Sequence, residues 1–354
     1  MRKTIKVAGR GKCAFRYSAF RRQSHVWLSV THKPWSAVIM FAEVRSFNDP
    51  QQHAGSILGW RQVYDQLGRG SLSTQLQQVS SERFQIFQEV LDKRVVQHGH
   101  APKGRLCLAL VLNSACAPVV QKHEVGAHSV VLLRDGEEFL LHAPEGTHLL
   151  AVTVDTVRFA KLAALELPQQ QLDLLKSASQ IAVPDAALKR FQQHVYPVFQ
   201  HLLHKADEVS EAAERLLEDG LIDALLDLFG SAQSESRGRH GNLAVSSYLV
   251  KKSQELARDC ADEPLSVLDL CERLRVSRRT LQNSFHVVAG IPPVEYLRNL
   301  RLNAVRRRLA STSTEACGVG EAAAQMGFYH LSHFSRNYRG LFGEYPSETR
   351  RATG

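Results

Sequence analysis

The chain has 354 residues, enough for two domains that each bury a hydrophobic core. Its hydrophobic content of 44% is ordinary for a globular protein, and no apolar run reaches the ~18 residues needed to cross a bilayer. Six scattered cysteines without a CxxC pair argue against a zinc module or a disulfide scaffold. This cysteine pattern fits a reducing compartment, so we expect a cytoplasmic protein without a membrane segment.

The net charge of +9 is unevenly distributed along the chain. Residues 1–39 hold nine Lys/Arg and no Asp/Glu, residues 40–236 hold 17 basic against 24 acidic side chains (−7), and residues 237–354 hold 18 against 11 (+7). A neutral-to-acidic middle joined to a basic end indicates a sensing or scaffolding domain beside a nucleic-acid-binding domain.

The basic segment 1–39 lacks helical or strand periodicity. We interpret it as a disordered extension or a mis-assigned start, with Met40 as the true first residue. A DNA-binding arm and a targeting peptide are the alternatives.

Residues 40–229 are predicted to form a β-rich domain for effector sensing and dimerisation. A helix is predicted first, over Ser56–Leu67, from apolar residues at helical spacing. Short strands separated by turns about every ten residues then predict a small, cupin-like barrel or a two-sheet sandwich. The strand candidates are Ser71–Val79, Phe84–Val90, Val95–His98, Leu106–Leu112, Ser129–Leu133, Phe139–His142 and Thr147–Val154.

Helices are predicted to complete this domain over Val157–Leu165, Ala186–His204 and Ala206–Phe229. The last carries a continuous apolar stripe, which is either core or a dimer seam. The Gly-, Ser- and charge-rich segment Gly230–Asn242 is a predicted linker. The predicted fold class is therefore α+β with two domains, the second of them all-α.

Residues 243–354 are predicted to form the DNA-binding domain, with an entry helix over Leu243–Ala261 and a helix-turn-helix unit at 266–288. Ser266 and Ser277 are placed to cap the two helices of this unit. Leu281, Phe285 and Val288 share the inward face of the second helix. The DNA-binding candidates on its exposed side are Ser277, Arg278, Arg279, Gln282 and Asn283, since Arg, Gln and Asn are the side chains that read base edges.

A second unit is predicted at 319–340, where small alanines allow close helix packing and Gly327 supplies the turn. Phe334 and Tyr338 face inward. The outward, DNA-binding candidates are His330, Ser332, His333 and Arg336. A final short helix is predicted over Ser347–Arg351, after Pro346.

A basic helix, Pro293–Ala310, joins the two units and should be ~27 Å long. This length, with the radii of the flanking helices, is compatible with the ~34 Å between successive major-groove faces. Arginines lie on this helix at 298, 301, 306, 307 and 308. We take Arg298 and Arg301 as candidates for phosphate contacts, which give affinity without sequence choice.

Three segments, SRRTLQNSF, YLRNLRLNAVRRRL and GFYHLSHFSRNYRGLFGEYPSETR, make this region resemble the DNA-binding domain of the AraC/XylS family of bacterial transcription regulators. The resemblance covers about a third of the chain. The resemblance implies a sequence-specific DNA-binding regulator, and an activator rather than a repressor. The partners that it implies are double-stranded DNA, RNA polymerase, a small-molecule effector and a second copy of the chain. It also implies base-reading roles for Arg279, Gln282 and Asn283 and for Ser332, His333 and Arg336.

A narrower resemblance, to the ethanolamine-operon regulator and related amine-responsive members, runs through WRQVYDQL, FQIFQEV, QHGH and VLDLCERLRVSRRTLQNSFH. It implies a small amine as effector, with adenosylcobalamin as a second effector and no other cofactor. Trp60, Tyr64, Phe87 and Glu89 are the effector-binding candidates, because aromatic rings and a carboxylate suit a small ammonium group.

The alternative is a cupin-like, metal-dependent enzyme or binding protein with a basic helical tail. His98, His100, His123, His128 and His142, with Glu89 or Glu124, are the residues that would supply its metal site. No GxSxG, HExxH, P-loop or GxGxxG motif is present. We therefore expect neither a catalytic nor a metal site.

Overall fold

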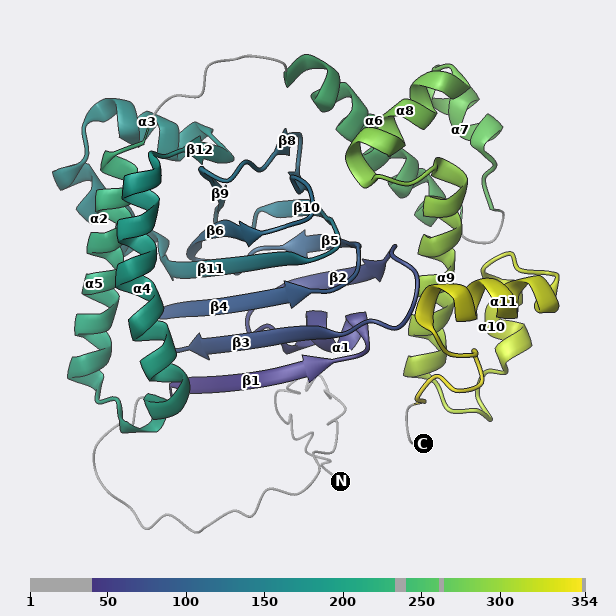
Figure 1. The fold of residues 1–354 in the computed structure, drawn as a ribbon, viewed down its shortest axis with the longest axis horizontal. Coiled ribbons are helices and arrows are strands. Elements are labelled where there is room, and N and C mark those ends of the chain that lie inside the picture. The colour runs from purple at the N-terminus through teal and green to yellow at the C-terminus, as the bar shows by residue number, and fades with distance from the viewer. Residues whose placement is uncertain (1–39, 233–239, 261–263, 352–354) are drawn as a thin grey trace, which may run out of the picture. The chain divides into compact units, whose positions relative to one another are not determined.

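The structure is a computed structural model that describes residues 40–232, 240–260 and 264–351 (Figure 1). The basic segment 1–39 and most of the expected linker lie outside these residues. None of the helices described is both long and apolar enough to cross a membrane.

The first part of the chain is β-rich and ends in helices. Its strands are β1 (Phe41–Phe47), β2 (Arg61–Gln66), β3 (Thr74–Ser80), β4 (Phe84–Leu91), β5 (Val95–His100), β6 (Arg105–Asn113), β7 (Val119–Val120), β8 (His123–Glu124), β9 (Ser129–Leu133), β10 (Glu138–Ala143), β11 (Thr147–Asp155) and β12 (Gln180–Ala182). Its helices are α1 (Pro50–Ser56), α2 (Thr156–Glu166), α3 (Gln169–Ser177), α4 (Asp185–Lys205) and α5 (Glu211–Gly230), with a 3-10 turn, η1 (Ala206–Glu208), between the last two.

The strands form two antiparallel sheets. The larger has the order β1-β3-β4-β11-β6-β9-β12, and the smaller has the order β2-β5-β10-β7-β8. Neither sheet closes on itself within the described residues, because β1 and β12 end one sheet and β2 and β8 end the other. The expected two-sheet arrangement is confirmed, whereas the cupin-like closed barrel is wrong.

The middle of the larger sheet is covered on both faces, which explains why β6, β9 and β11 read as nearly continuous apolar runs. On one face, Ile86 and Val152 pack with residues of α2, α4 and α5 (Figure 1). On the other face, Phe87 and Ala151 pack against residues of the smaller sheet, among them Leu141. Side chains that alternate along β4 and β11 thus supply two separate cores.

The helix predicted over Ser56–Leu67 is wrong. Helix α1 already ends at Ser56, Gly59 adopts a positive φ of 78°, and the following residues form β2. The apolar spacing fits a helix and a strand equally well over so short a stretch. Pairing with β5, from Arg61 opposite His100 to Gln66 opposite Val95, decides in favour of the strand.

Two other expectations are corrected, and one alternative left open by the sequence is narrowed. The helix predicted over Ala206–Phe229 begins only after η1, where the Ser210 side chain caps α5. Its apolar stripe is mainly core, since Leu221, Leu225 and Leu228 are buried. Residues 347–351 form a turn and not a helix. The elements β1, β7, β8, β12 and α3 were not predicted, because each is short or carries an irregular apolar pattern.

The C-terminal part is all-α, as expected. It contains α6 (His240–Asp259), α7 (Val267–Leu274), α8 (Arg278–Ala289), α9 (Pro293–Ser311), α10 (Val319–Gln325) and α11 (Leu331–Phe342). Helix α9 belongs to two cores, because Leu297 and Leu300 pack with Phe285 whereas Val305 and Leu309 pack with Phe334. One rigid helix therefore carries both helix-turn-helix units.

Candidate nucleic-acid interface and ligand cavity

The first helix-turn-helix unit consists of α7 and α8. Ser266 and Asp269 form a reciprocal capping box at the start of α7, and these hydrogen bonds lower the pKa of the Asp269 carboxyl group. Arg275 closes α7 with a positive φ of 55°, and Ser277 accepts a hydrogen bond from the Thr280 amide at the start of α8. Local chemistry therefore fixes the turn between the helices where the sequence predicts it.

Helix α8 separates its apolar and polar faces cleanly. Leu281, Phe285 and Val288 are buried. The five candidate residues all lie in the exposed first two turns: Ser277, Arg278, Arg279, Gln282 and Asn283. The Ser277 hydroxyl is already engaged as a cap, so the long side chains of this group are the ones free to reach a base edge.

The second unit, α10 and α11, repeats this arrangement. Ala322 and Ala323 are fully buried, and Gly327 has a φ of 74°. A Cβ atom on Gly327 would lie 2.0 Å from Pro264 Cγ, so the close approach excludes any larger residue. The His330 side chain makes no capping bond at the start of α11. His330, Ser332, His333 and Arg336 are all exposed.

The arginines of α9 do not share one environment. Arg298 is half-buried, 3.8 Å from Glu295, and Arg301 lies over the Phe328 ring, where burial lowers the pKa of its guanidinium group. Arg306 is buried against Asp49 and Glu344, and Arg307 pairs with Asp65. Only Arg308 is exposed. Of the two phosphate candidates, Arg298 is therefore the more available.

The free edge of β2 is covered by α9. Asn303 behaves like a strand residue, because its Oδ1 accepts from the Gln66 amide at 2.9 Å and its Nδ2 donates to the Gln66 carbonyl at 2.8 Å. One turn earlier, Asn299 donates to the Leu67 carbonyl at 3.1 Å. Burial would raise the pKa of Asp65, but Arg307 and His98 outweigh it and keep this carboxylate ionised. No local sequence pattern predicts these contacts.

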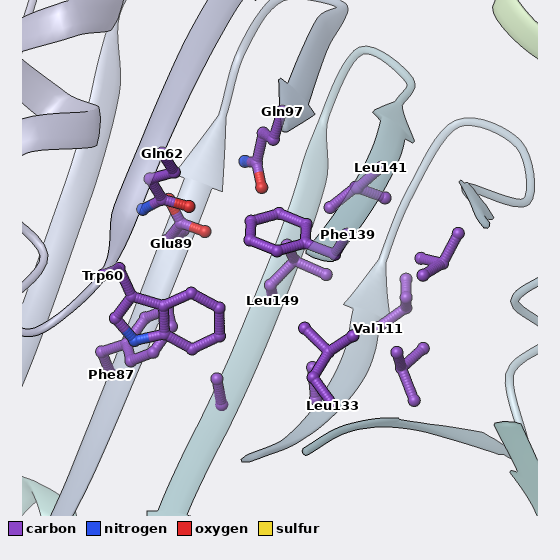
Figure 2. Close-up of a pocket in the computed structure, with 14 residues that line it drawn as sticks. Trp60, Gln62, Phe87, Glu89, Gln97, Val111, Leu133, Phe139, Leu141 and Leu149 are labelled. Atoms are coloured by element: carbon purple, nitrogen blue, oxygen red, sulfur yellow. The ribbon is translucent and has the colours of Figure 1, made fainter. Parts of the chain in front are cut away.

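A small cavity of about 60 Å³ lies between the two sheets (Figure 2). Trp60 stands edge-on to Phe87 and to Phe139, with ring centroids 5.6 Å apart in each pair. The other lining residues are mostly aliphatic: Gln62, Glu89, Gln97, Ala109, Val111, Val120, Val131, Leu133, Leu141, Leu149 and Ala151. In Figure 2 the polar groups of Gln62, Glu89 and Gln97 lie on one side of the rings and Val111 and Leu133 on the other.

A buried polar group stands behind Glu89. Tyr64 donates a hydrogen bond of 2.5 Å to Glu89 Oε1, and His53 Nε2 lies 3.1 Å from the same oxygen. Burial and the Glu89 charge raise the pKa of Tyr64 well above its usual value, so the phenol remains a donor. His53 Nδ1 is held in turn by Thr74 at 2.8 Å. Glu89 is therefore fixed at the cavity wall.

The four effector candidates from the sequence are brought together here, although in two roles. Trp60, Phe87 and Glu89 line the cavity, whereas Tyr64 lies outside it and orients Glu89. Sequence reasoning missed Gln97, which is 3% exposed and whose Nε2 lacks a hydrogen-bond partner. Alternation along β5, which points every second side chain inward, was the only signal for it.

The histidines considered for a metal site do not converge. His98 lies 3.7 Å from Asp65, and His142 bonds Tyr296 of α9. The described part of the chain contains no group of three or more His, Cys, Asp or Glu residues arranged to hold a metal ion.

Comparison with known proteins identifies the helical region. Residues 270–352 match the family model described as "Helix-turn-helix domain". The chain is similar to the "XylDLEGF operon transcriptional activator 1" of Pseudomonas putida, with 29% identity over 60% of this chain and 65% of that protein. It is also similar to the "XylDLEGF operon transcriptional activator 2" of the same organism, with 38% identity over 24% of this chain and 54% of that protein. The chain thus aligns with less than two thirds of either relative.

Two solved structures are also similar. One is the "AraC-like transcriptional activator CuxR", with 13% identity, coverage of 65% of this chain and 80% of that chain, and a TM-score of 0.36. The other is a "transcriptional regulator (AraC-type DNA-binding domain-containing proteins)" from Chromobacterium violaceum, with 34% identity, coverage of 30% and 93%, and a TM-score of 0.27.

Proposed function

We propose that the chain, whose C-terminal part carries a helix-turn-helix domain, is a transcriptional regulator of the AraC/XylS family that binds double-stranded DNA. The observation that carries the proposal is the pair of polar, exposed recognition faces on α8 and α11, both built on the single helix α9. The names of the two Pseudomonas relatives favour an activator.

The two units are suited to one continuous DNA site. Helix α9 has 19 residues and is therefore ~28 Å long. Because α8 packs near its start and α11 near its end, the recognition helices can address successive major-groove faces, ~34 Å apart. Both units then contribute base contacts in one monomer.

Replacing Arg279 with alanine is expected to weaken binding to the cognate site by ~1–3 kcal/mol, because a bidentate contact to guanine is lost. Binding to random duplex should change much less, because Arg279 does not make this guanine contact on most random sequences. The measurement is a competition titration of cognate against random DNA, with His286→Ala, also exposed on α8, as the control variant. Equal weakening on both duplexes would assign Arg279 to the phosphate backbone instead.

We further propose that the cavity between the sheets binds the effector. The small volume and aliphatic walls favour a small, largely apolar molecule with one polar end directed at Glu89 and Gln97. Glu89 supports the amine class, because a fixed carboxylate beside aromatic rings stabilises an ammonium group. Adenosylcobalamin is far larger than this cavity and would need a different site.

Ligand binding can reach the DNA-binding domain through β2. Gln62 lines the cavity, Tyr64 orients Glu89, and Gln66 bonds Asn303 of α9. A ligand that moves β2 by pressing on Gln62 would therefore change how α9 is held. Strand β10 offers a second path, because Leu141 lines the cavity and the adjacent His142 bonds Tyr296 of α9.

A thermal-shift screen of small amines, including ethanolamine, tests the effector proposal. A ligand at 100 times its Kd should stabilise the protein by about 2.7 kcal/mol. Glu89→Gln should abolish the shift caused by amines, whereas Trp60→Phe, which keeps an aromatic wall, should retain most of it. A shift caused by uncharged or anionic ligands alone would reject the amine class and leave the cavity as the site.

The remaining partners follow from this proposal. RNA polymerase is the partner of an activator, and such a regulator works in the cytoplasm. Dimerisation through the sensing domain is favoured by apolar side chains left exposed on α4 and α5, Tyr196 and Leu216. Sedimentation velocity of the wild type and of Leu216→Glu measures this directly.

A further inference from the structure

We propose that the sensing domain makes a DNA phosphate contact of its own, through Arg69, beside Arg298 and Arg336 of the helical domain. The inference rests on the proposed function. To the DNA contacts of the two helix-turn-helix units it adds one from outside them, made by the loop between β2 and β3.

This loop is held firmly against the end of the second recognition helix. The buried side chain of Gln66 bonds the carbonyl oxygens of Gly70 at 2.6 Å and of Leu341 at 2.7 Å. The Gly70 amide donates to the Gly340 carbonyl at 3.1 Å. A Cβ atom on Gly343 would lie 2.1 Å from Ser71 Oγ, so the two backbones approach as closely as glycine allows. Arg69 is thus positioned by its neighbours.

Three guanidinium groups from three elements surround one open cavity of about 290 Å³. They are Arg69 of the loop, Arg298 of α9 and Arg336 of α11. Arg69 is 72% exposed, and Arg336 is also a base-reading candidate. Arginine presents its N–H groups in a planar fork that matches a phosphate, so this cluster fits the DNA backbone next to the groove that α11 would enter.

Among the described residues that line this cavity, Glu295 alone is acidic. Its Oε1 lies 2.9 Å from Arg69 Nη2 and 3.8 Å from Arg298 Nη2. Three guanidinium groups against one carboxylate leave two positive charges at the cavity. An ion pair as exposed as Arg69–Glu295 is weak, so a phosphate can replace the carboxylate as the partner of Arg69.

A simpler interpretation is that Arg69 and Glu295 only tie the loop to α9. The two interpretations differ in whether the effect of Glu295 on DNA affinity depends on Arg69. If the pair is only a tie, any gain in affinity from removing the Glu295 charge should be the same with and without Arg69. If Glu295 competes with phosphate for Arg69, removing its charge should raise the affinity only while Arg69 is present.

The test is fluorescence anisotropy of the full chain with a mixed-sequence duplex of about 30 base pairs over a range of salt concentrations. Arg69→Ala should weaken binding and reduce the slope of log K against log salt by about 0.9, the loss of one phosphate contact. Glu295→Gln should bind more tightly than wild type, and adding Arg69→Ala should remove that gain. Arg61→Ala, which removes an exposed arginine of β2 away from this cavity, is the matched control.

The outcomes separate the two proposals. If the wild type binds the duplex but Arg69→Ala has the same slope as Arg61→Ala, the phosphate contact is rejected and the regulator proposal stands. An unchanged affinity of Glu295→Gln also rejects it. If the wild type does not bind duplex DNA at all, both proposals fail. Equal thermal melting of the variants shows that they are folded.

Discussion

Replacing Arg306 with methionine is expected to destabilise the folded chain by about 3–5 kcal/mol, because it leaves the buried Asp49 carboxylate without its charge partner. Arg306 is 7% exposed, and its Nε lies 2.8 Å from Asp49 Oδ2. Its Nη1 lies 2.7 Å from Glu344 Oε1, and its guanidinium group stacks on Phe342. Burial alone would lower the pKa of Arg306, but the acidic partners outweigh it and raise that pKa.

Urea unfolding at neutral pH measures this loss. Arg308→Met is the matched control, because Arg308 is exposed on the same helix and its replacement should cost less than about 0.5 kcal/mol. The double variant Asp49→Asn/Arg306→Met should lose less than the sum of the single variants, since it removes the unpaired charge, and Asn can still cap α1. Equal stability of the Arg306 and Arg308 variants would contradict the stabilising role of the ion pair between Arg306 and Asp49.

This ion pair also bears on how the protein is regulated. Asp49 caps the first helix of the β-rich domain, whereas Arg306 lies in the middle of α9. Together with the hydrogen bonds between Asn303 of α9 and Gln66 of β2, this ion pair holds the helix that carries both recognition faces. The β-rich domain thus restrains both units at once. Under the proposed function, its contacts with α9 are where an effector signal would act.

The helix-turn-helix units could be predicted in detail from the sequence. Serine caps set the helix starts of the first unit, and Gly327 supplies the turn of the second. In both units residues at helical spacing, such as Phe285 and Phe334, mark the inward face. Each of these signals acts within about one turn of the chain. Caps, turn glycines and apolar spacing act locally, so they can be recognised without knowing which distant segments pack against them.

Contacts between distant segments could not be predicted in this way. The sequence of β2 fits a helix as well as a strand until β5 pairs with it. The sequence shows that α9 is rich in arginine, but it does not show that Arg306 and Arg307 bind Asp49 and Asp65, more than 200 residues away. The positive charge of α9 can be predicted from its composition, but the partner of each arginine cannot.

The cavity is an intermediate case. Aromatic and acidic residues near Trp60 and Glu89 could be selected by chemistry alone, and the structure places both at the cavity wall. Gln97 could not be selected, because a glutamine in a strand is usually solvent-exposed. Its role depends on which face of β5 is turned inward, and that is set by pairing with β2 and β10.

Acidification is expected to destabilise the protein through His142, a buried histidine that contacts α9. Burial lowers the pKa of His142 to about 3, and its Nε2 bonds the Tyr296 hydroxyl at 3.1 Å. In the unfolded chain the same imidazole titrates near its ordinary value of 6.5. The unfolded state therefore binds a proton before the folded state does, so the stability contributed by neutral His142 is complete above pH 6.5 and is lost as the pH falls toward 3.

Each pH unit below 6.5 removes about 1.4 kcal/mol, so about 3 kcal/mol should be lost by pH 4. Unfolding of the wild type and of His142→Gln, measured between pH 7 and 4, isolates this contribution. Glutamine can still bond the Tyr296 hydroxyl but does not titrate, so the advantage of the wild type over this variant should shrink by about 3 kcal/mol on acidification. His100→Gln, at an exposed position of β5, should show no comparable change. If the wild type keeps its full advantage at pH 4, His142 is accessible to protons in the folded state, and the contact between β10 and α9 opens more readily than its burial implies.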